Sequence, residues 1–356
     1  MIVVNYGIDI AQTTYDTLVA SDIRNYLDKS MNVAIKPNLV VPRPAYDGAT
    51  THPQCVEGIL RFLSDYGVSA VKIIESAWVG DCTKMALQVC GYEPLLKKYG
   101  VPFADLKDDS YTARVYGDLE ISICNKALSC DFLINVPVLK AHCQAGMTCC
   151  MKNLKGCIPD FEKRRFHSLG LDKPIAVLNA ILKPGYNVVD GICGDLSFEE
   201  GGNPVYSNRI MAGRDSFKID SYCAELIGYA PEEIGYLSYA RKAGFGDFFI
   251  EGHDKQVELH SSDKPVHIDD SRRRANKSAN RIDDDAACSA CYSALVRALH
   301  KMPDFRIKEN VHIGQGFKRV TGKGIGVGDC AAGYSHSVAG CPPKVTDIME
   351  MLAGIK

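Results

Sequence analysis

The sequence has 356 residues, of which 46% are hydrophobic and 24% are charged, a composition typical of a globular protein with room for one large and one small domain. Its formal net charge is only −2, so the chain as a whole has no field that would attract nucleic acid or an acidic membrane surface. The longest apolar stretch, residues 132–139, contains Asn135 and Pro137 and is too short to cross a bilayer. We therefore expect neither a nucleic-acid partner nor a membrane partner.

The cysteines and the N-terminus indicate a cytoplasmic protein. There are 15 cysteines, an odd number, and they are scattered through apolar segments such as residues 121–124, unlike the framework of a secreted disulfide-rich protein. Residues 1–9 lack the basic start and the long apolar segment of a secretory signal. So many free thiols fit a reducing compartment.

Apolar runs rich in β-branched residues alternate with helical patterns along most of the chain. The sequence predicts strands at residues 31–35, 68–74, 132–136 and 187–190, and helices at 53–66, 82–91, 95–99, 175–182 and 216–227. The helix at 53–66 is the clearest, because Val56, Ile59 and Leu63 recur on one face and Gly67 ends it. The alternation predicts an α/β fold with a mainly parallel, doubly wound sheet and helices on both faces.

A polar segment divides the chain into two parts. Residues 269–285 contain a basic run at 272–274 and three aspartates at 283–285. We interpret this segment as a connector between an α/β body at 1–268, which holds the substrate crevice, and a C-terminal subdomain at 286–356. A nucleic-acid patch is the alternative, but the adjacent carboxylates would weaken it.

Polar side chains follow each predicted strand at the point where it ends. From the first strand to the fourth they are Lys36 and Asn38, then Glu75, then Lys140 and His142, and finally Asp190. Because the carboxyl ends of parallel strands form the ligand crevice of an open sheet, we expect these side chains to line one pocket. The alternative is that they are ordinary loop residues that cap the following helices.

A second polar segment, which contains Lys152, Lys155 and His167, adds cations to this region. Lysine supplies charge for a carboxylate or a phosphate, and asparagine fixes its orientation, so we predict an anionic small-molecule ligand. Imidazole titrates near neutrality, which makes His142 and His167, together with Lys140, our candidate catalytic groups, although a lone histidine is more often structural. The predicted binding residues are Lys36, Asn38, Glu75, Lys152, Asn153, Lys155 and Asp190.

Two further features of this region are less specific. Cys143, Cys149, Cys150 and Cys157 could hold a second metal, but their irregular spacing and the adjacent pair favour core thiols. The loop at 199–204 is rich in glycine, yet it lacks the lysine of a phosphate-binding loop and the glycine spacing of a dinucleotide site. We therefore predict no nucleotide site there.

Four cysteines near the C-terminus carry the clearest chemistry. Cys288 and Cys291 form a Cys-x-x-Cys pair at the start of a helical run, whereas Cys330 follows a glycine-rich strand and Cys341 precedes Pro342. Four thiolates can hold an iron–sulfur cluster or zinc. The proline after the last cysteine favours a cluster, and four ligands suit a 4Fe–4S cluster. A two-iron cluster, zinc and buried free thiols are the alternatives.

Several of these motifs recur in the same order in a known family. They are Lys36-Pro37-Asn38, Thr50-Thr51-His52-Pro53, Lys140-Ala141-His142, the segment 152–156 with His167 downstream, and Val189-Asp190-Gly191. Over roughly residues 30–230 the chain resembles the family catalogued as domain of unknown function 362. The resemblance implies the same fold and a redox context, since members often carry iron–sulfur ligands. Many members have an appended ferredoxin with a CxxCxxC run. This chain lacks that run, and its four C-terminal cysteines would stand in for it.

Together these patterns predict an iron–sulfur oxidoreductase, or an electron-transfer component, that acts on an anionic ligand. One alternative is a non-redox lyase, isomerase or ligase in which the cluster is structural or acts as a Lewis acid. Another is a carrier that delivers a cluster or a metal to a partner. A redox partner protein and a homodimer are further expectations, and the sequence leaves open whether a flavin takes part.

Overall fold

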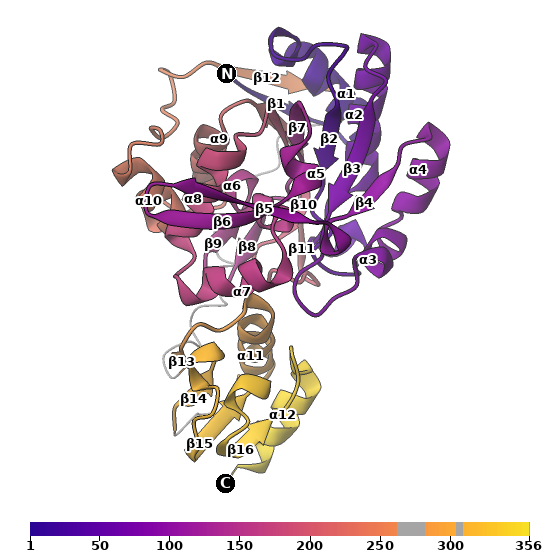
Figure 1. The fold of residues 1–356 in the computed structure, drawn as a ribbon. Coiled ribbons are helices and arrows are strands. Elements are labelled where there is room, and N and C mark those ends of the chain that lie inside the picture. Colours follow the sequence, from indigo (N-terminus) through magenta and orange to yellow (C-terminus); the bar gives the residue numbers. More distant parts are fainter. Residues whose placement is uncertain (262–281, 304–308, 356) are drawn as a thin grey trace.

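The computed structural model describes residues 1–261, 282–303 and 309–355. Within these residues the chain forms a large α/β body and a smaller C-terminal subdomain, which lies against the end of the body where α7 (Asp160–Ser168) is found (Figure 1). The expected connector falls mostly outside the described residues, from 269 to 281.

A sheet of eight strands forms the centre of the body. In spatial order the strands are β12 (Gln256–His260), β1 (Ile2–Tyr6), β11 (Pro204–Gly213), β10 (Tyr186–Asp195), β7 (Phe132–Asn135), β2 (Val33–Lys36), β3 (Val71–Glu75) and β4 (Phe103–Asp105). Neighbours from β10 through β4 pair in parallel, whereas β11 runs antiparallel to both β10 and β1. The prediction of a mainly parallel α/β sheet is confirmed.

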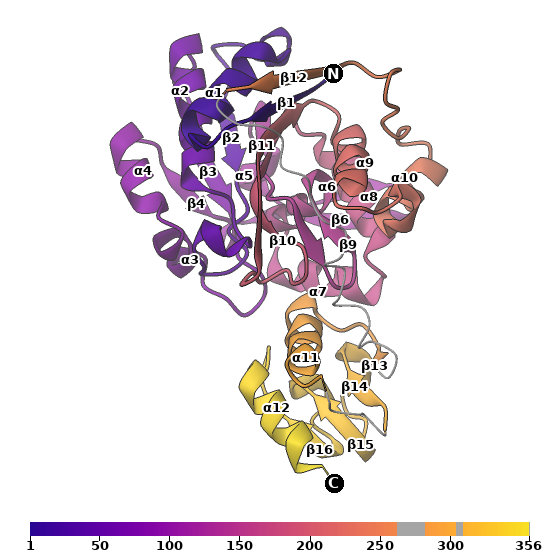
Figure 2. The same ribbon diagram turned by 180° about the vertical axis from the view of Figure 1, so that it is seen from behind.

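Helices cover both faces of this sheet (Figure 2), because successive strand residues point to opposite sides. In β2, Val33 and Ile35 pack into a core with the first group of helices, while Ala34 packs into a second core with the other group. The first group is α1 (Ile10–Ala20), α2 (Pro53–Tyr66), α3 (Thr83–Val89) and α4 (Tyr92–Tyr99), and the second includes α8 (Asp172–Leu182), α9 (Ser216–Leu226) and α10 (Gly235–Lys242). The sheet is therefore doubly wound, as predicted.

Several shorter elements complete the body. They are the hairpin β5 (Tyr111–Tyr116) and β6 (Leu119–Cys124), helix α5 (Asn125–Leu128), the hairpin β8 (Lys140–His142) and β9 (Gly146–Thr148), and helix α6 (Cys150–Asn153). Strand β8 carries two of the predicted catalytic residues, Lys140 and His142. Helix α6 carries Lys152 and Asn153 close to the same place in the chain.

The predicted elements match the observed ones best where the pattern is local. The helix predicted at 53–66 has the same bounds as α2, and the strand predicted at 31–35 overlaps β2. The strand predicted at 187–190 is only the first half of β10, which continues to Asp195 because it pairs with β11. Strand β11 itself was not predicted, since its first half contains Pro204, Ser207 and Asn208 in place of an apolar run.

The C-terminal subdomain has its own sheet and its own hydrophobic core. Its strands, in spatial order, are β13 (Ile282–Asp284), β14 (Val311–Ile313), β15 (Gly322–Val327) and β16 (Tyr334–Val338), and neighbours pair in parallel. Helices α11 (Ser289–Lys301) and α12 (Val345–Gly354) contribute Leu295 and Ile348 to the core. Because β13 belongs to this sheet, the subdomain includes residues 282–284, which we expected in the connector.

Candidate functional site

A cavity lies where the sheet of the body meets the C-terminal subdomain. Its lining includes Lys36, Lys140, Lys152, Lys155 and Lys163, and we call it the lysine pocket. The predicted residues Asn38, Glu75, His142, Asn153 and His167 also line it. Residues 288–290, from the start of α11, complete its wall. The carboxyl ends of β2 and β3 thus contribute to one cavity, as the strand-end pattern indicates.

Lys36 and Glu75 form a buried ion pair across the ends of two neighbouring strands. The ammonium of Lys36 lies 2.7 Å from the Glu75 carboxylate, and the two side chains are 1% and 3% exposed. The other Glu75 oxygen accepts the backbone N–H of Ser76 at 2.7 Å. Gly156 makes this arrangement possible, because a Cβ there would collide with both charged groups. The pair therefore builds the floor of the pocket.

Two other lysines donate to neutral oxygens, and Lys163 also forms an ion pair with the Asp160 carboxylate at 3.1 Å. Lys140 donates to the carbonyl oxygens of Ala49 (2.8 Å) and Glu199 (2.6 Å). Burial lowers the pKa of Lys140 to about 8, against the opposing charge of Glu199. Lys163 donates to the Ser76 hydroxyl and to the Ala77 carbonyl oxygen, both at 2.7 Å. Both ammonium groups thus have protein acceptors of their own.

Lys152 and Lys155 are much less engaged. Lys152 contacts the Thr148 hydroxyl at 3.3 Å, and Lys155 lies 3.2 Å from Nε2 of His167. Within the described ranges neither ammonium has a carboxylate as an ion-pair partner. Burial, and then the charge of Lys152, lowers the pKa of Lys155 to about 7. A bound anion would supply the missing counter-charge at these two side chains.

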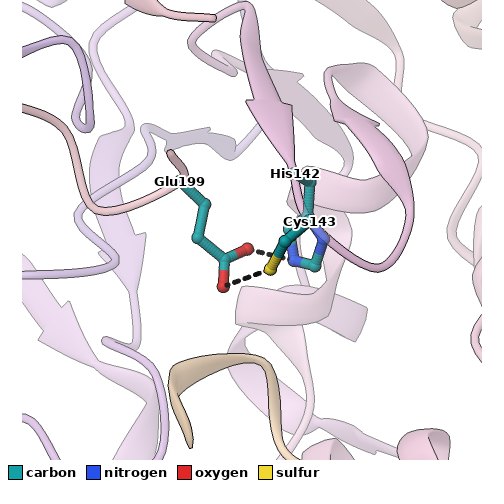
Figure 3. Close-up of side chains that lie close together, drawn as sticks. All are labelled: His142, Cys143 and Glu199. Atoms are coloured by element: carbon teal, nitrogen blue, oxygen red, sulfur yellow. Dashed lines mark hydrogen bonds and ion pairs between the residues drawn. The ribbon is translucent and has the colours of Figure 1, made fainter. Parts of the chain in front are cut away.

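His142 faces a buried carboxylate that the sequence analysis did not assign to the site (Figure 3). Its Nδ1 accepts the backbone N–H groups of Gln144 (3.2 Å) and Ala145 (3.0 Å). In the neutral imidazole the proton is therefore on Nε2, which lies against the Glu199 carboxylate. Burial, and then nearby lysines, hold the pKa of His142 well below its usual value, while burial raises the pKa of Glu199.

The same group has the composition of a metal site but not the geometry. Ligand atoms of His142, Cys143 and Glu199 all lie within 4.8 Å of one another. A metal-bound histidine normally donates a hydrogen bond through its second ring nitrogen. Here that nitrogen accepts two N–H groups, so binding a metal at Nε2 would require an imidazolate. The group is better suited to holding and moving a proton. The acidic pair at 199–200 is the signal in the sequence that could have identified this carboxylate.

His167 connects the pocket to the C-terminal subdomain. Its Nε2 lies 3.2 Å from the Lys155 ammonium and 3.5 Å from the Ser289 hydroxyl. Burial, and then the charge of Lys155, keeps the pKa of His167 well below its usual value. A neutral His167 is thus in contact with Lys155 of the body and with Ser289 of the C-terminal subdomain, the residue that follows Cys288.

The structure does not bring Asp190 to the lysine pocket. Its carboxylate accepts the backbone N–H of His52 at 2.7 Å and lies 2.8 Å from Nδ1 of the same residue. Both side chains are fully buried. Asp190 is not at a strand end, because β10 runs on to Asp195. Its predicted binding role is therefore replaced by a structural pair with His52.

The four C-terminal cysteines line a second cavity, of about 380 Å³, which we call the cysteine cavity. Cys288 is the N-cap of α11, Cys291 lies in the first turn of that helix, and Cys330 and Cys341 come from loops beyond β15 and β16. Cys288 and Arg164 line both the cysteine cavity and the lysine pocket. The two cavities are therefore direct neighbours.

The spacing of the four cysteines and their surroundings bear on which kind of centre they could hold. Four thiolates around one zinc would lie about 3.8 Å apart, as follows from Zn–S bonds of about 2.3 Å in a tetrahedron. Among the described residues these cysteines do not form a group whose sulfurs all lie within 4.8 Å. Gly328, with a φ of 87°, brings the backbone close to Cys291, since a Cβ there would lie 3.7 Å from its sulfur. The N-terminus of α11 also favours an anionic centre.

The core accounts for Cys149, Cys150 and Cys157. Cys149, Cys150 and Asp220 have ligand atoms within 4.8 Å of one another and are fully buried. The Asp220 carboxylate, however, accepts the backbone N–H groups of Cys150 (2.6 Å) and Met151 (3.0 Å), and so it already caps α6. Cys157 packs in the hydrophobic core. This arrangement favours core thiols, the interpretation that the spacing also favoured.

Comparisons with known proteins identify a family but no activity. The sequence pattern of the family described as "Domain of unknown function (DUF362)" matches residues 33–225. A thylakoid-associated protein of Synechocystis is 24% identical over 231 residues, which are 62% of this chain and 70% of that protein. None of the described helices is both long and apolar enough to cross a membrane.

Two solved structures are similar to parts of this chain. One is the lactate racemase apoprotein from Thermoanaerobacterium thermosaccharolyticum, with a TM-score of 0.45, 14% identity, and coverage of 64% of this chain and 57% of that one. The other is a Thermotoga maritima protein, with a TM-score of 0.39, 12% identity, and coverage of 67% and 60%. This chain spans less than two thirds of each, and with TM-scores below 0.5 neither supports a functional argument.

The buried ion pair gives a first prediction. Replacing Lys36 with methionine leaves the Glu75 carboxylate buried without a counter-charge, so we expect the free energy of unfolding to fall by about 3–5 kcal/mol. The double variant Lys36→Met/Glu75→Leu should recover most of that loss. Urea unfolding followed by circular dichroism measures both. Lys98→Met, which breaks the exposed pair with Glu57, is the matched control and should change stability little. A single variant as stable as the wild type would contradict this prediction.

The pKa of Lys155 gives a second prediction. Its protonated form binds an anion, and in the free protein it loses that proton near pH 7. Binding above that pH must take up a proton, so the affinity for a carboxylate should fall by up to about tenfold per pH unit between about pH 7 and pH 9. Calorimetric titration with acetate at several pH values measures this slope. Lys155→Met should bind more weakly and lose this slope. An unchanged slope would assign the titration to another group.

Proposed function

This chain belongs to the DUF362 family, and we propose that it is an iron–sulfur protein that binds an anionic small molecule beside its cluster and exchanges electrons with it. The observation that carries this proposal is the wall shared by the two cavities. Cys288 and Arg164 line both of them. A ligand in the lysine pocket would therefore lie next to one of the four cysteines.

Cys288, Cys291, Cys330 and Cys341 would hold the cluster, and four thiolates suit a 4Fe–4S cluster. When bound, such a cluster supplies single electrons at a fixed position. The backbone N–H groups at the start of α11 and the charges of Arg164 and Lys318 would stabilise an anionic centre in this cavity.

The body supplies the binding and proton-handling groups. Lys152 and Lys155 bind the anionic end of the ligand, because they lack carboxylate partners within the described residues. Asn153, fixed by its 2.8 Å hydrogen bond to Asn135, orients the ligand. Glu199 and His142 hold a proton at the His142 Nε2 position, and His167 connects Lys155 to Ser289. Residues 288–290 of the C-terminal subdomain form part of the pocket wall.

We also propose that the protein is cytoplasmic and works with a redox partner. Free cysteines without disulfides fit the reducing cytoplasm. An electron-transfer function requires a redox partner protein, and a homodimer is the simplest assembly. None of the described residues that line the lysine pocket indicates a flavin-binding site.

The direct experiment is anaerobic purification with iron and sulfide analysis, followed by EPR before and after dithionite. We expect about four irons and four sulfides per chain and a signal that appears on reduction. Cys288→Ala and Cys341→Ala should lose the chromophore, while Cys149→Ala and the exposed Cys82→Ala should keep it. Circular dichroism checks that the variants fold, and Cys341→Ser provides a second substitution at the same position.

Other outcomes would favour the other functions. A colourless protein with one zinc per chain would overturn the redox proposal. A cluster that resists reduction, in a protein that still transforms its ligand, would favour a non-redox enzyme. Stoichiometric transfer of the cluster to an apoprotein acceptor would favour a carrier.

A further inference from the structure

The lysine pocket has two zones that differ in burial and in polarity. Its floor is formed by buried polar side chains, among them Lys36, Glu75 and Asn153. Its rim is formed by half-buried apolar side chains, Val40, Trp78 and Val79. A ligand that fills both zones must therefore be charged at one end and apolar at the other.

Trp78 is the single tryptophan of the chain, and it is held in place by polar anchors. Its indole N–H donates to the Asp81 carboxylate, and its backbone N–H donates to the Val40 carbonyl oxygen at 3.1 Å. Its carbonyl oxygen accepts a hydrogen bond from the Lys107 ammonium at 3.0 Å. The ring is thus fixed at the rim before any ligand binds.

Core packing does not explain this tryptophan. Trp78 belongs to none of the three hydrophobic cores found in the described part of the chain. A large aromatic side chain that is rigid, half-buried and placed at the rim of a cavity offers a flat surface to a ligand. Aromatic rings stack on such a surface with a gain beyond that of burying their area.

We propose that the ligand of the lysine pocket is an aromatic carboxylate, with its ring against Trp78 and its carboxylate at Lys152 and Lys155. This inference rests on the proposed anion pocket and specifies its ligand class. Lys152 and Lys155 recognise the carboxylate, and Val40 and Val79 flank the ring.

The test compares three carboxylates by calorimetric titration of the anaerobically purified full-length protein. Acetate carries the charge alone, cyclohexanecarboxylate adds an apolar ring, and benzoate adds an aromatic ring. Stacking and burial together predict that benzoate binds at least about tenfold more tightly than acetate and more tightly than cyclohexanecarboxylate.

Two variants separate the ring from the charge. Trp78→Leu should remove the advantage of benzoate over cyclohexanecarboxylate, while Trp78→Phe should keep most of it. Lys152→Met should weaken all three ligands to a similar degree. Equal binding of benzoate and cyclohexanecarboxylate by the wild type would overturn the aromatic assignment but leave the anion pocket in place. Failure of all three carboxylates to bind would overturn the anion pocket and this inference with it.

Discussion

Several ammonium groups are buried at one edge of a parallel sheet, and each of them needs an oxygen partner or must lose its proton. The protein meets this constraint in three ways. Lys36 has a carboxylate, Glu75, in a pair that requires a glycine at position 156. Lys140 has two carbonyl oxygens and a lowered pKa. Lys155 has only a histidine nitrogen at 3.2 Å. Because Lys155 lacks the oxygen partners that Lys36 and Lys140 have, its ammonium marks a position that an anion would occupy.

The second constraint is the placement of the C-terminal subdomain. Gln144 of the body contacts the carbonyl oxygen of Ala287 at 3.0 Å, and Gln315 of the subdomain contacts that of Arg164 at 3.1 Å. Figure 1 shows α11 next to the body. The polar contacts hold the start of α11 against the lysine pocket. They make Cys288 a wall residue of both cavities. If the cysteine cavity holds a redox centre, the same docking places that centre next to the lysine pocket.

The sequence predicted the parts of this site that depend on local patterns. Lys36 and Glu75 end buried parallel strands, so the strand-end rule brought them to one cavity. The rule failed for Asp190 because β10 continues along β11, and that pairing with a distant, partly polar strand has no local signal. Glu199 was missed for a similar reason. Its place in the site depends on contacts with His142 and Lys140, which lie far away in the chain. The four C-terminal cysteines could be found by spacing, but their closeness to the pocket depends on how two domains dock.

The central claim is that an anion in the lysine pocket lies next to a cluster bound through Cys288. Electron–nuclear double resonance on the reduced protein, with acetate labelled with ¹³C at its carboxylate, tests it most directly. We expect a ¹³C hyperfine coupling that disappears in a Lys152→Met/Lys155→Met variant whose own cluster signal is unchanged. A reduced cluster that shows no coupling to bound acetate would contradict the claim.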